Sequence, residues 1–367
     1  MKCSAQMASL RALSALGLPA ELFIPAALEM MHGIIPSLRN LFDWTDAQGD
    51  LIRYYFEGPI DPRIAAHYFE EFHNRREGDV MPTFRQAVTG RSVIRSAQEL
   101  ENDAFFGSAL YNEIWRPQGL HTRLEAVVRN AGGRPLGSLV LYRGPGERSF
   151  SREDEVLLEQ ASRYVARGLQ VPSAGLVAGE FVERRDRRAV LSLDADGRLC
   201  HLSPDALKML LLSHGDVTPD NVGRTHRRED FPTLSLLWQH HRRPGAPGHD
   251  GLVITVENAW GRFVYESTPM APLGEGAAPM LHVGIRQQEP YGLGLRRAID
   301  ALPLSPAQRE VCALLHVGRS TTDIAASLSI SPATVADHVK KIYARLDVHS
   351  VHELSARIHR QVAARVA

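Results

Sequence analysis

The sequence has few cysteines, and their positions exclude two common ways of stabilising a fold. The three cysteines, Cys3, Cys200 and Cys312, lie far apart in the chain. They form no CxxC pair, and no Cys/His spacing is typical of zinc, so we expect neither a disulfide framework nor a structural metal site. Sparse, unpaired cysteines suit a reducing cytoplasm.

The chain also lacks a long uncharged apolar run. Its alanine- and leucine-rich start is interrupted by Arg11, Glu21 and Glu29 before any span reaches secretory or membrane length. The chain also has no excess of charge of one sign, since 42 basic residues balance 42 acidic ones. This balance excludes a polybasic or acidic-tail protein. We therefore expect a cytoplasmic protein. The length of 367 residues predicts two or three domains.

The motifs of the common enzyme classes are absent from the sequence. It contains no P-loop, no Gly-x-Ser-x-Gly, no His-Glu-x-x-His and no kinase motif set. We also find no phosphoacceptor domain of the response-regulator type. We therefore expect no enzyme, no catalytic residues and no cofactor. Regulation by a small-molecule effector or a partner is favoured over phosphorylation.

The first 170 residues alternate between helical and strand patterns. Apolar periodicity predicts helices over 7–16, 19–34 and 62–76, and strands over 38–45, 51–57, 122–130 and 136–143. Ser151 and Asp154 form a capping-box pattern that opens a helix running to about residue 170. Helices before, within and after a mostly antiparallel sheet indicate an α+β architecture.

A second sheet-rich unit follows a boundary near residue 171. A hairpin is predicted over 189–202, a helix from Ser203-Pro204 to about residue 214, and strands over 251–258, 262–268 and 280–287. The Arg- and His-rich stretch 224–243 could bind an anion or a metal. Its acidic residues and prolines break any ligand spacing, so we favour a solvated loop.

From Ser305 onward the pattern is helical only. Four cap signals predict four short helices: Ser305-Pro306, Ser320 with Asp323, Ser331-Pro332, and Ser350 with Glu353. The third predicted helix, over 332–346, has an apolar stripe of Val335, Val339, Ile342 and Leu346. Its opposite face carries small residues and adjacent lysines, as a helix-turn-helix that approaches DNA requires. The adjacent lysines are Lys340 and Lys341, and the only other lysines of the chain are Lys2 and Lys208.

Residues 304–354 resemble a LuxR-type DNA-binding domain. The matching positions are Leu304, Glu310, Leu314, Leu315, Gly318, Ser320, Ile324, Ala325, Leu328, Ile330, Ser331, Thr334, Val335, His338, Ile342, Leu346, Val348 and Leu354. The resemblance implies an all-α tetrahelical helix-turn-helix domain whose helix 332–346 enters the major groove. It also implies a homodimer contact through the last helix, over 351–365.

The family's DNA-contacting positions carry over onto nine residues. Base contacts fall on Ala336, Asp337 and Lys340, and phosphate contacts on Thr321, Thr322, Ser331, Thr334, Lys341 and Arg345. The chain departs from the family at Ala336, where a basic residue is frequent, and at the acidic Asp337. An Asp can accept a hydrogen bond from cytosine N4 but is repelled by phosphate. The base preference therefore does not carry over from other members.

Residues 1–170 are similar to GAF-like sensor domains, on the order of their helices and strands and on the segments 111–120 and 134–137. Residues 186–290 resemble a reduced PAS-like sheet. Such domains bind a small molecule or form dimers. Candidate ligand contacts are Trp44, Tyr54, Tyr111, Trp115 and His121, and the alternative for each is core packing.

These observations predict a multidomain α+β protein with two GAF/PAS-like antiparallel sheets flanked by helices and a C-terminal helical domain. The expected divisions are a sensor domain over 1–170, linkers over 171–185 and 291–303, a PAS-like domain over 186–290 and a DNA-binding domain over 304–367. The predicted function is a dimeric transcriptional regulator that binds double-stranded promoter DNA and contacts RNA polymerase. The alternative is a ligand sensor whose C-terminal helices contact a protein instead of DNA.

Overall fold

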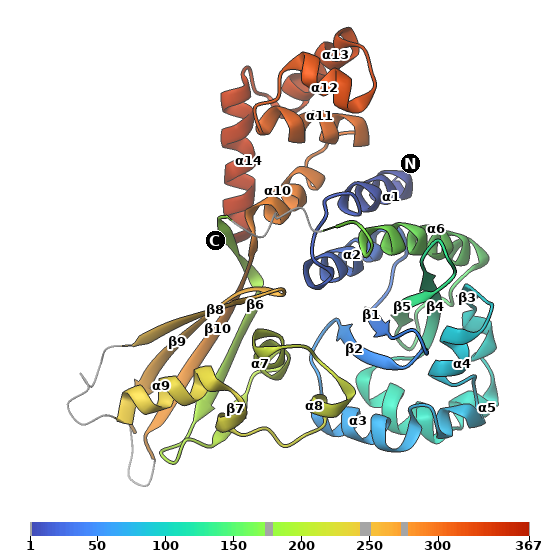
Figure 1. Ribbon diagram of the computed structural model, residues 1–367, viewed down its shortest axis with the longest axis vertical. Coiled ribbons are helices and arrows are strands. Elements are labelled where there is room, and N and C mark those ends of the chain that lie inside the picture. The colour runs from blue at the N-terminus through green and yellow to red at the C-terminus, as the bar shows by residue number, and fades with distance from the viewer. Residues whose placement is uncertain (1, 173–178, 243–250, 273–277, 367) are drawn as a thin grey trace.

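The computed structural model describes residues 2–172, 179–242, 251–272 and 278–366. It contains two five-stranded antiparallel sheets with helices packed around them, followed by a group of helices only (Figure 1). The predicted α+β class is therefore confirmed. None of the described helices combines the length and the apolar character that a membrane span needs.

The first sheet has the strand order β2-β1-β5-β4-β3. Its strands are β1 (Arg39–Thr45), β2 (Leu51–Phe56), β3 (Ile94–Arg95), β4 (Thr122–Arg129) and β5 (Pro135–Arg143). One face is covered by α1 (Lys2–Leu13), α2 (Ala20–Ile34) and α6 (Arg152–Gly168), and the other by α3 (Pro62–His67), α4 (Phe84–Thr89), α5 (Asp103–Phe106) and short π- and 3-10-helical turns (Figure 1). The predicted capping box is present, since the Ser151 side chain accepts from the Asp154 N–H.

Strand alternation decides which side chains of this sheet enter the helical core. Phe42 and Leu141 are fully buried and point toward the covering helices. Leu41 and Tyr142, one position away on the same strands, line a cavity on the opposite face. The two faces of the sheet therefore serve different purposes, packing on one and a potential binding space on the other.

The helix predicted over 62–76 is broken into three pieces. After α3 the chain forms a π-helical turn over Tyr68–Phe72 and a 3-10 turn over Arg76–Asp79. The break is stabilised by the buried Glu77, whose carboxylate accepts from the N–H groups of Asn74 (2.8 Å) and Phe84 (2.7 Å). Asn74 has φ 54, which no continuing α-helix allows.

The second sheet has the order β7-β6-β10-β9-β8. Its strands are β6 (Phe181–Leu193), β7 (Leu199–Leu202), β8 (Leu252–Asn258), β9 (Gly261–Met270) and β10 (Met280–Pro290). The helices α7 (Ala206–His214) and α9 (Pro232–Arg242) pack on the sheet, and α8 (Pro219–Val222) faces the first domain. The predicted hairpin, helix and three strands of this unit are all present.

The Arg- and His-rich stretch 224–243 is not the expected loop, because it contains α9. This helix buries Leu234 and Leu237, and the Trp238 ring lies under the guanidinium groups of Arg228 (4.0 Å) and Arg242 (5.2 Å). Apolar burial and cation–π contact outweigh the charge of the segment. Among the described residues, no group of His, Cys, Asp or Glu side chains is placed to hold a metal ion.

Regular structure also extends into both expected linkers. The strand β6 begins at Phe181, because Phe181–Glu183 pair with the last residues of β10. The helix α10 (Tyr291–Asp300) follows β10 directly and buries Leu293, Ala298 and Ile299. Residues 173–178 of the first linker lie outside the described residues.

A cluster of charged side chains joins the two sheet domains to α10. Glu29 on α2 accepts from Arg184 (2.8 Å) and Arg187 (3.0 Å) of β6, and also pairs with Arg297 of α10. Glu289 at the end of β10 accepts from Arg297 Nε (3.1 Å). Because the Glu29 side chain is only 23% exposed, solvent screens these contacts weakly.

We predict that Glu29→Gln lowers the free energy of unfolding by about 1–3 kcal/mol, since it weakens several charge-assisted hydrogen bonds at once. Chemical denaturation of the full chain measures this change. The control is Glu159→Gln, which removes an exposed helical pair with Arg163 and is expected to cost about 0.5 kcal/mol or less. Equal effects of the two substitutions would contradict a special role for Glu29.

Candidate functional site

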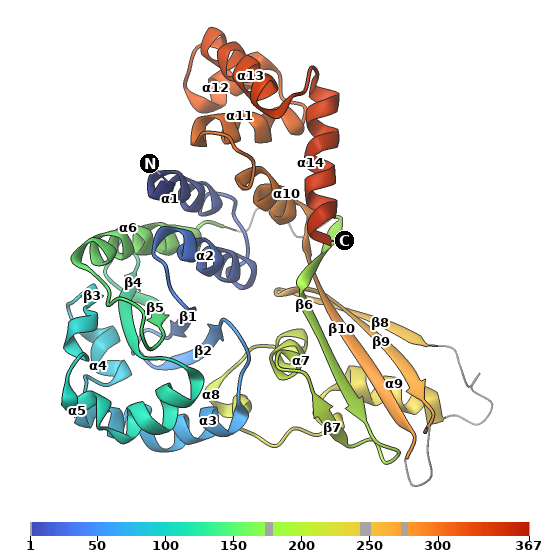
Figure 2. The same ribbon diagram turned by 180° about the vertical axis from the view of Figure 1, so that it is seen from behind.

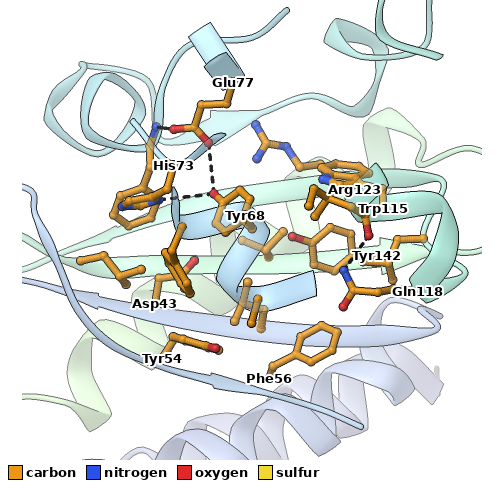
Figure 3. A pocket seen from close by; sticks show the side chains of 18 of the residues that line it. Asp43, Tyr54, Phe56, Tyr68, His73, Glu77, Trp115, Gln118, Arg123 and Tyr142 are labelled. Carbon is orange, nitrogen blue, oxygen red and sulfur yellow. Dashed lines mark hydrogen bonds between the residues drawn. The ribbon is translucent and has the colours of Figure 1, made fainter. Parts of the chain in front are cut away.

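A cavity of about 140 Å³ lies between the π-helical turn over Tyr68–Phe72 and the face of the first sheet that α3, α4 and α5 cover (Figure 3). Its wall is largely aromatic and is formed by Tyr54, Phe56, Tyr68, Phe69, Phe84, Trp115 and Tyr142. These rings come from five separate parts of the chain, two strands and three helical regions. The cavity is therefore a product of the tertiary fold and not of one local motif.

Two arginines share one carboxylate in the wall of this cavity. Glu125 on β4 is 3.0 Å from Arg123 and 3.6 Å from Arg95, and it accepts from the Ser138 hydroxyl at 2.7 Å. Burial alone would raise the pKa of Glu125, but Arg123 and Arg95 hold the pKa below its ordinary value. Glu125 is therefore ionised and neutralises part of the positive charge.

Asp43 on β1 is a buried carboxyl that faces the same cavity. The residue is 8% exposed, and its side chain makes no hydrogen bond or ion pair to any residue that the structure describes. Burial, reinforced by Glu125, raises the pKa of Asp43 well above its usual range, although Arg123 opposes the shift. In Figure 3 Asp43 lies among Tyr54, Tyr68 and His73.

The π-helical turn supplies the opposite wall. The Tyr68 hydroxyl donates to Glu77 Oε2 at 3.1 Å, so this carboxylate is satisfied by the protein itself. Burial lowers the pKa of His73 to about 4, which leaves the imidazole neutral near pH 7. The polar groups on this wall are thus already engaged or uncharged, unlike Asp43 opposite them.

Two of the five predicted ligand residues line the cavity, namely Tyr54 and Trp115. Tyr111 and His121 are hydrogen-bonded to each other at 2.8 Å but lie outside the lining. Trp44 is on the other face of the sheet, where its ring lies 4.6 Å below the Arg53 guanidinium. The parity of β1 explains this, because a residue adjacent to Asp43 must point the other way.

Sequence reasoning missed Asp43, Arg123, Glu125 and Tyr142. A signal was available, because charged residues stand inside strands that are otherwise apolar, at positions sharing one face. Charged groups are rarely fully buried unless they are paired or functional.

The C-terminal helices are α11 (Pro306–His316), α12 (Thr321–Leu328), α13 (Pro332–Leu346) and α14 (Val351–Val366). The capping hydrogen bonds predicted at the start of all four helices are present. Ser305, Ser320 and Ser331 accept from the N–H three residues later, and the Glu353 N–H donates to Ser350 at 3.1 Å. Ser329, with φ 54, ends α12 and opens the turn to α13. This sequence of elements is a helix-turn-helix.

Helix α13 divides into a buried and an exposed face, as its pattern predicts. Val335, Ile342 and Leu346 are fully buried against α11 and α12. The exposed face consists of Ala333, Ala336, Asp337, Lys340, Lys341 and Ala344. Both views place α13 at the end of the molecule farthest from the second sheet (Figure 1, Figure 2).

The nine predicted DNA contacts lie on α12, on α13 or in the turn between them. All nine are exposed: Thr321, Thr322, Ser331, Thr334, Ala336, Asp337, Lys340, Lys341 and Arg345. Ser331 also caps α13 by accepting from the Thr334 N–H, and the hydroxyls of the two residues lie 2.8 Å apart. Arg345 donates to the carbonyl of Pro303 at 3.3 Å, which directs it along the domain edge.

Asp337 and Lys341 form an ion pair one helical turn apart, at 2.6 Å. The hydrogen bond from Lys341 lowers the pKa of Asp337. Both side chains are more than half exposed, and such pairs contribute little to stability. Lys341 can therefore exchange this partner for a phosphate at small cost.

Contacts also connect the first domain to the helix-turn-helix domain. Ser9 on α1 donates to Asp300 at the end of α10 (2.9 Å) and accepts from Arg309 on α11 (3.3 Å). The buried Arg296 on α10 pairs with Asp300 (3.0 Å) and with Glu310 on α11 (2.8 Å). Helix α14 packs on α10 and β6. The position of the DNA-binding helices is thus tied to α1 and α10.

Comparison with known proteins supports the assignment of this domain. Residues 302–357 match the model of the luxR family of bacterial regulatory proteins. Three curated mycobacterial relatives, one of them "Putative HTH-type transcriptional regulator Rv0890c" of Mycobacterium tuberculosis and another from Mycobacterium bovis, are 25% identical over 239 residues. The match covers 63% of this chain, which spans only 25% of the length of each relative.

Similar solved structures include the VqmA dimer of Vibrio cholerae, a LuxR-type receptor, at 18% identity, and the DhaR(N)–DhaL complex of E. coli, at 14%. They cover 48% and 76% of this chain, and the chain covers 84% and 86% of theirs. Their TM-scores of 0.21 and 0.25 establish no common overall arrangement. The family match and the four capped helices agree on the same residues, and the C-terminal part of this chain is a helix-turn-helix domain that matches the luxR family.

Proposed function

We propose that this protein is a DNA-binding transcriptional regulator of the LuxR type, with α13 as the helix that enters the major groove. The observation that carries the proposal is the exposed face of α13 within a domain that matches the luxR family. Its three alanines allow the helix backbone to approach the bases closely. Its two lysines supply the positive charge that phosphate contact needs.

Within this face, each side chain has a distinct proposed role. Lys340 makes no ion pair with any described residue and is free to reach a base edge or a phosphate. Asp337 accepts a hydrogen bond from a cytosine amino group, provided that Lys341 turns away toward the backbone. Ser331, which caps α13, and Thr334 in its first turn lie beside the first N–H groups of the helix, to which we assign a phosphate.

We further propose that the regulator acts as a homodimer in the cytoplasm and that promoter binding brings it to RNA polymerase. On α14, Leu354, Ile358 and Val362 are buried inside the chain. A dimer contact through this helix must therefore use its exposed side, which begins with Val351, 41% exposed.

The sensor role rests on the cavity and on the contacts that lead away from it. A small molecule between the first sheet and the π-helical turn changes the packing of that domain. Its α1 and α2 touch α11 and α10 through Ser9 and Glu29. These contacts provide a physical connection between ligand occupancy and the position of α13.

We predict that Lys340→Ala and Lys341→Ala each weaken binding to duplex DNA that the full-length protein selects from random sequence. The expected loss is about 1–3 kcal/mol where a base contact disappears, and a salt slope smaller by about one where a phosphate contact disappears. Fluorescence anisotropy at several salt concentrations measures both quantities. Arg163→Ala, an exposed change on α6 far from α13, is the control and leaves affinity unchanged.

DNA affinity that stays at the wild-type value in both lysine variants would reject the assignment of α13. Failure of the wild-type chain to select any duplex would instead favour the alternative, in which the C-terminal helices contact a protein.

A further inference from the structure

The cavity in the first domain is lined by more negative than positive side chains. Its charged lining residues are Asp43, Asp61, Glu77, Glu125, Arg95 and Arg123. The two arginines already share the carboxylate of Glu125, and Glu77 is held by two backbone N–H groups and a tyrosine. The buried carboxyl of Asp43 is left without a hydrogen-bond or ion-pair partner among the described residues.

An unpartnered carboxyl in such a place is costly for the ligand-free protein. Removing an ionised carboxylate from water carries a large free-energy penalty unless a cation or several donors compensate it. Glu125, Arg123 and Glu77 act on Asp43 through their charges, and the titratable groups beside it in Figure 3 are Tyr54, Tyr68 and the neutral His73. Arg123 is the one positive charge among these groups, and it already pairs with Glu125. A ligand that brings its own cation would remove the penalty.

We propose that this cavity binds a small organic cation, a protonated amine with an apolar body, whose ammonium group lies beside Asp43. The inference rests on the sensor role proposed above and names the class of ligand. The surrounding rings suit it, because aromatic faces attract a cation that has been removed from water. The volume of about 140 Å³ is close to that of a cavity of about 150 Å³ that holds benzene, so a body of about one ring fits.

An anionic ligand is disfavoured beside Asp43. Beside Asp43 it would face a second negative charge. Near Arg123 and Arg95 it would meet the carboxylate of Glu125, 3.0 and 3.6 Å from the two guanidinium groups, although one buried Nη2 atom of each arginine has no hydrogen-bond partner among the described residues. A neutral ligand would leave Asp43 to be satisfied by a donor group alone.

Three probes that share one ring and differ in charge test the proposal: benzylamine, benzyl alcohol and benzoate. Each is titrated by calorimetry into the full-length protein without DNA. We expect benzylamine to bind at least ten-fold more tightly than either of the others. In Asp43→Asn this preference disappears, while in the control Asp79→Asn, an exposed carboxylate outside the cavity, it persists.

The stability of Asp43→Asn shows whether a loss of binding reflects unfolding. Because the folded-state pKa of Asp43 is raised, mainly by burial, ionisation disfavours the folded state at every pH above the ordinary Asp pKa of about 4. Near or below that pH the substitution changes little. As the pH rises toward neutrality, Asp43→Asn should melt at an increasingly higher temperature than the ligand-free wild type, and Asp79→Asn should not.

Tighter binding of benzoate than of benzylamine would overturn the proposal, as would a benzylamine affinity that is the same in Asp43→Asn and the wild type. Absence of binding by all three probes would also overturn it for ligands of this size. Because DNA is left out, these outcomes are independent of DNA recognition. A protein that binds benzylamine but no duplex would retain this inference and lose the proposed function.

Discussion

Glu29 sits where three separate parts of the chain meet, and the relative placement of the domains depends on the ion pairs that it forms. The residue belongs to a helix of the first domain, yet its carboxylate binds arginines from β6 of the second sheet and from α10. Helix α10 in turn holds α11 through the buried Arg296. The DNA-binding helices therefore take their position in part from one partly buried carboxylate and its arginines, together with the Ser9 contacts and the packing of α14.

A second constraint is the two-residue period of the first sheet, which separates packing from binding. Phe42 and Leu141 fill the face under α1, α2 and α6, while Asp43 and Tyr142 line the cavity on the other face. A shift of one residue in strand pairing would exchange these sets and bury charge in the core. The register of β1 against β5 is thus as important for the cavity as the identity of any residue in its wall.

The sequence predicts the local structure of this protein better than its sites. Side-chain caps act within a few residues, so Ser305, Ser320 and Ser331 were enough to place the C-terminal helices and the exposed face of α13. The cavity brings together residues that are 80 positions apart in the chain, such as Asp43 and Arg123, and no local sequence pattern predicts that they are neighbours. Trp44, a predicted ligand contact, lies on the face of the sheet away from the cavity. The prediction considered that the residue is aromatic but not which face of the strand it occupies. The π-helical turn escaped prediction because a single buried carboxylate, Glu77, breaks an otherwise helical pattern.

The exposed face of α13 is not covered by any element that the structure describes. In a protein arranged in this way a signal has nothing to unmask, since the DNA-reading surface is available in the single chain. A signal can instead act by changing the direction in which that surface points. In the proposed dimer, two such surfaces must match half-sites spaced by about one helical turn of DNA, roughly 34 Å. Small rotations of α10 would then change which half-site spacing the dimer can bind. Regulation would act on the angle between the α13 helices of the two copies.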